Sequence, residues 1–280
     1  VEMPPPLEVM SALLLAFVVG LSMTAVKSDN LYNVLEELNA MVLKVVTTFV
    51  IPLLPIYIFG TFLNLGMNEN FGDTMAAMGV VLVLSIVMTL VIVLLQYLLA
   101  GAIAGVNPFT ALKNMLPAYF TALGTSSSAA TIPVTYESTL KNKVEEEVAG
   151  FVVPLCATIH LSGSMMKITL YALSIVYMAS LDISGGQIIG FILLLGIMMI
   201  AAPGVPGGAI MAAVGLLQSN LGFDESMVSL MIASYIVVDS FGTAANVTGD
   251  GAIALIVNKL AGGKIKGQQL NDALSAEPAR

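Results

Sequence analysis

The feature that most constrains this chain is a row of polar residues inside an otherwise apolar run from Met227 to Ala261. Positions four, seven and eleven residues apart return to one face of an α-helix, because each residue advances the helix by about 100°. The residues that share this face are Asp239, Thr243, Asn246 and Asp250. Carboxylates in so apolar a setting are costly unless they face a partner, an ion or water. We therefore predict that this polar face forms one wall of a binding site.

The overall composition indicates an integral membrane protein. Hydrophobic residues make up 58% of the chain and charged residues 10%, and the mean hydropathy is +0.95. These values disfavour the alternative, a core helix of a soluble protein whose aspartates are paired structurally. The net charge of -8 comes from acids spread over short loops and a polar tail, so we expect no nucleic-acid partner. The single cysteine, Cys156, allows no internal disulfide and fits no metal-ligand spacing.

Three long apolar segments come first in the chain: Met10–Val26, Met41–Leu65 and Met75–Val106. A polar loop, Lys27–Glu37, is expected between the first two. Pro52 and Pro55 are expected to kink the second segment, because proline lacks the N–H group that the helix ladder needs. The third segment is more than long enough to cross a hydrocarbon core of about 30 Å.

A short apolar segment follows, Phe109–Leu123, whose helix reaches only about 22 Å and so stops partway through a bilayer. The hydroxyl-rich stretch Thr125–Ser128 disfavours a continuous helix, and Ala129–Leu140 comes after it as a second arm. We predict a re-entrant helical hairpin with its tip at Thr125–Ser128. A single spanning helix, whose serines bond back to backbone carbonyls, is the alternative.

A second hairpin is predicted later in the chain. Gln187–Ala202 is again too short to cross comfortably, and Pro203–Gly208 contains two prolines and three glycines, which cannot continue a helix. Ala209–Leu221 supplies the return arm. Between the two hairpins, the segment Val148–Ala179 is expected to break at His160–Ser164, where a glycine between small polar residues weakens the helix.

The order of a hairpin and then a broken helix therefore occurs twice, in Phe109–Ala179 and in Gln187–Ala261. Corresponding interrupted segments in two halves of a membrane protein point to a transport site near the bilayer midplane. We predict an all-α integral membrane protein with an inverted repeat, two re-entrant hairpins that enter from opposite faces, and broken transmembrane helices.

Three motifs together carry a family resemblance: T-S-S-S-A-A-T-I-P at Thr125–Pro133, P-G-V-P-G-G-A-I at Pro203–Ile210 and N-V-T-G-D at Asn246–Asp250. In this order they resemble the dicarboxylate/amino acid:cation symporter family, the glutamate-transporter homologues. The resemblance covers nearly the whole chain. It implies a multi-pass protein of the cytoplasmic membrane that is a symporter rather than an enzyme, and a homotrimer whose transport domains move as elevators.

The resemblance also implies domain boundaries. Compared with the family, the chain is expected to begin near the end of the fourth transmembrane element. Residues 1–74 then belong to the scaffold, residues 75–262 form the transport domain, and residues 263–280 form a polar cytoplasmic tail.

Site residues follow from the matching motif positions. In the family, the first hairpin tip and the asparagine bind the substrate α-carboxylate, the first aspartate holds its α-ammonium, and the second hairpin tip is a gate. The substrate residues implied here are Ser126, Ser127, Ser128, Val205, Pro206, Gly207, Asp239, Gly242, Thr243 and Asn246. The residues implied for sodium, through side chains or backbone carbonyls, are Thr158, His160, Asn246 and Asp250.

Two positions that carry arginine in acidic-substrate members are uncharged here. One is Gly242, which is expected to leave open space beside Thr243, and the other is the hydroxyl-bearing Thr125. A side-chain carboxylate buried without a cation costs several kcal/mol, whereas Asp239 still calls for an ammonium. We therefore expect a zwitterionic amino acid with a neutral side chain, and transport of acidic amino acids or dicarboxylates is the alternative.

The family motif N-M-D-G-T reads H-L-S-G-S at His160–Ser164, so Ser162 replaces a carboxylate that serves a sodium site. Lys167 lies too deep in its segment to reach water easily along its stem, which is the alternative role of such a lysine. His160, Ser162 and Lys167 are therefore candidates for coupling. We expect sodium as the coupling ion, at fewer sites than acidic-substrate members use, with a proton as the alternative.

Two rival functions stay open at this point. A membrane-embedded hydrolase would use Ser127 as nucleophile and His160 as base, although the chain has no G-x-S-x-G motif. The other rival is a transport-inactive fragment that only packs against partners.

Overall fold

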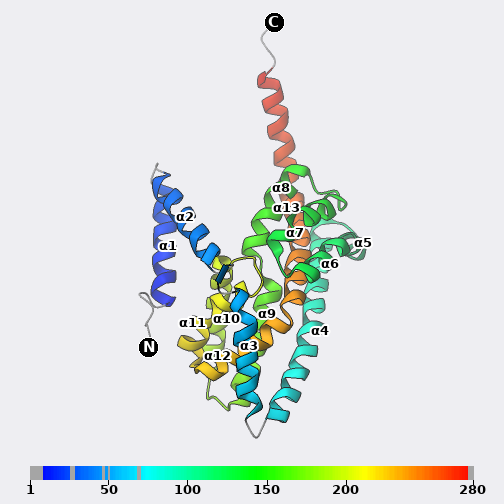
Figure 1. The fold of residues 1–280 in the computed structure, drawn as a ribbon. Coiled ribbons are helices and arrows are strands. Elements are labelled where there is room, and N and C mark those ends of the chain that lie inside the picture. The colour runs from blue at the N-terminus through cyan, green and yellow to red at the C-terminus, as the bar shows by residue number, and fades with distance from the viewer. Residues whose placement is uncertain (1–8, 26–28, 46–47, 50, 68–70, 277–280) are drawn as a thin grey trace.

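The computed structural model describes residues 9–25, 29–45, 48–49, 51–67 and 71–276. Nearly all of these residues are helical and no β-strand occurs among them, which confirms the all-α prediction for the described chain (Figure 1). The helices are α1 (Val9–Ala25), α2 (Asn30–Val45), α3 (Ile51–Gly66), α4 (Phe71–Ala104), α5 (Pro108–Asn114), α6 (Leu116–Thr125), α7 (Ser128–Leu140), α8 (Glu146–Ile159), α9 (Ser162–Met178), α10 (Gly185–Ala201), α11 (Gly208–Leu221), α12 (Glu225–Val237) and α13 (Asp239–Ala276).

Two stretches within the described residues are long and apolar enough to cross a membrane. They are Gly72–Ala104 in α4, and Glu146–Met178, which comprises α8 and α9. The bent pair of α12 and α13 adds a third when it is counted as one span. Large apolar side chains face outward along α4, where Val80 is 68% and Leu95 is 58% exposed. Such a continuous apolar surface is unfavourable in water and suited to lipid.

Helix α13 is the central element, and it contacts α4, α6, α7, α8 and α9. Figure 1 shows its first part, drawn in orange, beside α4 and between the first hairpin and the α8–α9 pair. Small residues allow this close approach: a Cβ on Gly251 would lie 2.7 Å from the Tyr97 hydroxyl of α4. Ala244 and Ala245 are fully buried in the same cluster. The polar face of α13 is therefore surrounded by protein.

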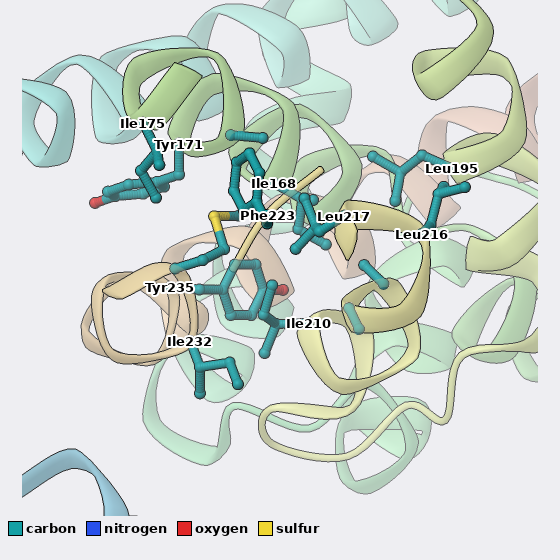
Figure 2. Packing of buried hydrophobic residues seen from close by; sticks show 14 of the residues in the cluster. Ile168, Tyr171, Ile175, Leu195, Ile210, Leu216, Leu217, Phe223, Ile232 and Tyr235 are labelled. Carbon is teal, nitrogen blue, oxygen red and sulfur yellow. The ribbon is translucent and has the colours of Figure 1, made fainter. Parts of the chain in front are cut away.

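A second apolar cluster packs α9 against α10, α11 and α12 (Figure 2). Ile168 and Tyr171 of α9 lie near Ile210 of α11 and Tyr235 of α12 in this cluster, and all four are buried. Between helices in a bilayer, close van der Waals packing of such side chains stabilises the contact. The cluster thereby fixes the second hairpin beside the end of α12.

The N-terminal part departs from the sequence prediction. The predicted loop Lys27–Glu37 is largely wrong, because α2 begins at Asn30; Lys27 itself lies outside the described residues. This stretch alternates apolar and polar residues with helical spacing, which the abundance of polar residues obscured. Pro52 lies in the first turn of α3, where a missing N–H costs little, and Pro55 lies inside that helix.

Both predicted hairpin tips separate two packed helices. The first hairpin turns at Ser126, which has the left-handed φ of 50°, so the continuous-helix alternative is wrong. Its first arm is not the single helix that was expected, because the chain breaks at Met115 between α5 and α6. Pro117 in the first turn of α6 explains the break, since it has no N–H to continue the ladder from α5.

The two broken helices are also present. The expected interruption at His160–Ser164 is confirmed, because α8 ends at Ile159 and α9 begins at Ser162. The second break lies at Val238, where α12 and α13 meet with a bend of 62°. Asp239 is therefore the first residue of α13, and the four residues of the polar face lie on one helix as predicted.

Candidate functional site

The start of α13 places the Asp239 carboxylate against the second hairpin tip. Its Oδ2 atom accepts a hydrogen bond of 2.8 Å from the backbone N–H of Gly207. Gly207 has a φ of +72°, a left-handed conformation in which glycine avoids the strain of a Cβ. A carboxylate in the first turn is also favoured by the positive end of the helix dipole. The aspartate thus connects the α12–α13 break to the tip before α11.

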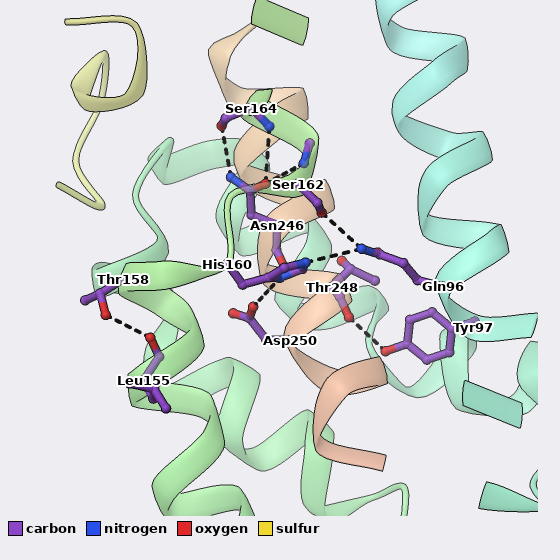
Figure 3. A network of polar contacts seen from close by, with 11 residues as sticks. Gln96, Tyr97, Leu155, Thr158, His160, Ser162, Ser164, Asn246, Thr248 and Asp250 are labelled. Carbon is purple, nitrogen blue, oxygen red and sulfur yellow. Dashed lines mark hydrogen bonds and ion pairs between the residues drawn. The ribbon is translucent and has the colours of Figure 1, made fainter. Parts of the chain in front are cut away.

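Asn246 caps the start of α9 from across the interface. Its Oδ1 atom accepts from the N–H groups of Gly163, at 2.8 Å, and Ser164, at 3.3 Å, and its Nδ2 donates to the Ser164 hydroxyl at 3.0 Å (Figure 3). The residue that precedes α9, Leu161, provides no side-chain cap of its own. An asparagine on α13 therefore satisfies N–H groups that the break in α8–α9 leaves without helical partners.

The two hairpin tips touch each other. The Ser127 hydroxyl donates to the carbonyl of Gly204 at 3.0 Å. Its oxygen also accepts from the N–H of Ala130, so Ser127 is the N-cap of α7. A Cβ on Gly204 would lie 2.8 Å from the Ala157 carbonyl oxygen, so glycine is needed for this close approach. The tips and α8 consequently form one tight junction.

A small pocket lies between the two tips and the polar face of α13. It is lined by Ser126, Ser128, Leu161, Ser164, Pro203, Gly204, Val205, Ala209, Asp239, Thr243 and Asn246. Six of the predicted substrate residues are therefore brought together. The cavity is about 10 Å³, which is room for about one water molecule. A larger ligand requires the tips to separate.

Four other predicted substrate residues lie around this pocket rather than in its lining. Ser127 bridges the tips, and Pro206 and Gly207 line a neighbouring cavity of about 200 Å³ that also reaches Asp239. The expectation of open space at Gly242 is wrong: a Cβ there would overlap Cε of Lys167 and lie 2.5 Å from its Nζ. The sequence could not show that a lysine on α9 fills this space.

The His160 ring lies at the break between α8 and α9, against α13 (Figure 3). Its Nδ1 atom is 2.8 Å from Oδ1 of Asp250 and 3.1 Å from the carbonyl oxygen of Asn246. Both partners are acceptors, so Nδ1 is the protonated ring nitrogen. Gln96 of α4 contacts the other ring nitrogen at 3.2 Å and donates to the Ser162 hydroxyl at 3.0 Å. The imidazole N–H thus bonds to the Asp250 carboxylate and the Asn246 carbonyl, the oxygens that the resemblance implies as sodium ligands.

Thr158 lies elsewhere, on the wall of a larger cavity. This cavity of about 640 Å³ is also lined by Ala129, Pro203, Gly204 and Val205. The Thr158 hydroxyl donates to the carbonyl of Leu155 within its own helix. The structure therefore separates Thr158, beside the hairpin tips, from a second group formed by His160, Asn246 and Asp250.

Sequence reasoning did not single out Ser164 or Gln96 as site residues. Ser164 belongs to the H-L-S-G-S stretch, so its closeness to the break was an available signal. Gln96 was not distinguished from the other uncharged polar residues in the apolar run of α4, Ser85 and Thr89. The hydrolase alternative finds no support in the geometry, since the Ser127 hydroxyl donates to Gly204 and the His160 ring to Asp250. A nucleophilic serine needs its base within hydrogen-bond reach.

Comparison with known proteins gives a family match. The sequence profile of the family described as "Sodium:dicarboxylate symporter family" matches residues 4–260. Excitatory amino acid transporter 1 of Ambystoma tigrinum is 33% identical over 164 residues, which cover 58% of this chain and 30% of that protein. Excitatory amino acid transporter 3 of Bos taurus is 35% identical over 155 residues, covering 55% and 29%. The chain therefore spans about 30% of the length of these curated relatives.

Proposed function

This chain belongs to the sodium:dicarboxylate symporter family, and from that premise we propose that it takes part in cation-coupled transport of a neutral, zwitterionic amino acid across the cytoplasmic membrane. The observation that carries the proposal is the pocket between two hairpin tips and the polar face of a buried helix. Binding there requires the tips to part, and their closure again afterwards isolates the substrate from both sides. That is the requirement for a carrier with a central site.

The two poles of the pocket match the two charges of an amino acid. Asp239 offers a carboxylate to an ammonium group, and Ser128 at the start of α7 offers an N–H group and a hydroxyl to a carboxylate. The N-terminus of a helix attracts anions through its unpaired N–H groups and its dipole. No lysine or arginine lines the described pocket. A substrate side chain with its own negative charge would therefore be buried without a direct partner.

For the coupling ion, the proposal is sodium at fewer sites than acidic-substrate members use. Support comes from the cavity beside Thr158, where the tip residues Pro203–Val205 can supply backbone carbonyl oxygens, the ligands that suit hard monovalent cations. At the other group, the His160 N–H already satisfies the oxygens of Asp250 and Asn246. A sodium ion would have to displace the ring there. A proton is the alternative coupling ion.

The finer architecture is proposed from family membership. It comprises a scaffold portion in residues 1–74, a transport domain in residues 75–262, and a polar cytoplasmic tail in residues 263–280, whose backbone continues α13 to Ala276. Residues 1–8 and 277–280 lie outside the described part. We further propose that the two hairpins enter from opposite membrane faces as an inverted repeat, and that a homotrimer moves its transport domains as elevators.

Uptake of labelled alanine or serine by this chain in proteoliposomes tests the substrate class. We expect uptake that excess glutamate does not inhibit, and loss of uptake in Asp239→Asn. Asp224→Asn is the matched control, because Asp224 is an exposed N-cap of α12 whose role asparagine can fill. Strong inhibition by glutamate would sink the neutral-substrate proposal. Absence of uptake for all amino acids, in a folded preparation, would favour the transport-inactive fragment.

The coupling ion is tested by the sodium dependence of the initial uptake rate, with wild type set beside His160→Asn/Ser162→Asp. We expect a shallow dependence in wild type that becomes steeper in the double variant, because asparagine and aspartate return the family's ligand types. A steep dependence that the double variant leaves unchanged would contradict this. Uptake that persists without sodium and follows an imposed proton gradient would identify the proton as the coupling ion.

A further inference from the structure

Lys167 of α9 is a fully buried cation whose ammonium lies against the break at Val238. Its Nζ donates to the carbonyl oxygens of Val238, at 2.7 Å, and Asp239, at 3.2 Å, and lies 4.3 Å from the centre of the Tyr235 ring. The same Nζ is 3.8 Å from Oδ1 of Asp239. An ammonium has three donors and no acceptor. All of these neighbours are acceptors or an aromatic face, so the surroundings match the charged form of the lysine.

A glycine in α13 makes room for the Lys167 side chain. A Cβ at position 242 would overlap the end of the Lys167 side chain, so Gly242 leaves the room that the ammonium occupies. Lys167 and Gly242 lie on different helices, yet the lysine side chain fits only because the residue at position 242 has no Cβ. Breaking α12 at Val238 also exposes the carbonyl that the ammonium binds, and a cation at the C-terminal end of a helix is favoured by the helix dipole.

Charge balance gives this arrangement a consequence for the ligand. Asp239 is the one ionisable group in the lining of the described pocket, and Lys167 lies behind it without reaching the lining. The pair together carries no net charge. Because a net charge in a buried site is costly, a neutral site accepts a ligand whose own charges cancel. Without the lysine, the site would carry one negative charge and select a cation.

We propose that Lys167 determines substrate class: it cancels the charge of Asp239 from behind and so makes the pocket selective for ligands with no net charge. This inference rests on the proposed function and deepens it. Lys167 does not touch the ligand and acts through Asp239, so it is a positioning residue.

Three probes with one carbon skeleton test the proposal near neutral pH: alanine, with no net charge, alaninamide, with a positive charge, and lactate, with a negative charge. The measurement is the concentration of each that halves uptake of labelled alanine by proteoliposomes, or that protects the detergent-solubilised chain from thermal unfolding. For wild type we expect alanine to be the strongest. For Lys167→Met, which keeps most of the stem and removes the charge, the alaninamide-to-alanine ratio should shift by at least about tenfold towards alaninamide, or roughly 1.4 kcal/mol.

Lys113→Met is the matched control, because Lys113 is an exposed lysine on α5, and its ratio should stay at the wild-type value. Lys167→Ala/Gly242→Arg returns a cation from the other helix and should restore the preference for alanine over alaninamide, also where Lys167→Met fails to fold. A folded Lys167→Met variant with an unchanged alaninamide-to-alanine ratio would refute the role of Lys167 but not the proposed function. A folded double variant that does not prefer alanine over alaninamide would do the same. Failure of all three probes to bind wild type refutes the proposed function as well.

Discussion

Replacing Asn246 by leucine should separate α9 from α13, because this one side chain makes three hydrogen bonds across their interface. Leucine has a similar volume but leaves the buried N–H groups of Gly163 and Ser164 without an acceptor. It also removes the donor to the Ser164 hydroxyl. An unsatisfied buried group costs about 1–3 kcal/mol, so the variant should lose roughly 2–5 kcal/mol of stability.

The assay is the apparent Tm of the detergent-solubilised chain, which should fall by roughly 5–15 °C. Asn39→Leu is the matched control, because Asn39 is exposed on α2, and its Tm should stay close to the wild-type value. Ser164→Ala removes only the hydroxyl contact and should cost about 1 kcal/mol. If Asn246→Leu unfolds at the wild-type temperature, the capping role is refuted.

Three further substitutions test close contacts of the fold. Gly208→Ala should abolish uptake, because its Cβ would overlap the backbone carbonyl oxygen of Pro203 and deform the tip, whereas Gly190→Ala, which has open space, should leave uptake unchanged. Tyr97→Phe should lower stability by about 1 kcal/mol in thermal unfolding, since the fully buried hydroxyl donates to a carbonyl of α13 at 2.9 Å. Gly163→Ala should cost about 1–3 kcal/mol by forcing α9 away from α13, and an unchanged Tm would contradict the packing described.

The approach of the two tips is tested separately, with cysteines at positions 127 and 205 after Cys156→Ser removes the native thiol. We expect an oxidative cross-link in membranes, because the Ser127 hydroxyl already reaches the residue before Val205. Free labelling of both positions by an impermeant reagent, without any cross-link, would refute the closed arrangement of the tips.

The sequence by itself determined the local elements of this protein. The polar face of α13 follows from helical periodicity, and the second tip follows from prolines and glycines that cannot continue a helix. The break at His160 was visible for the same kind of reason. These are properties of neighbouring residues, so they do not depend on where other helices lie. The break at Met115 and the early start of α2 were missed because one proline and a few polar residues are weak local signals.

Only the tertiary structure decided which of these elements meet and which side chains pair. The partners of Lys167 at the break between α12 and α13 are more than 70 residues away, and those of His160 on α13 more than 80. Gly242 seemed to offer an open space because its occupant comes from α9. Such pairings depend on how far each helix is rotated and how closely two helices approach. Periodicity within one helix does not encode either quantity, because both are set by packing against several others.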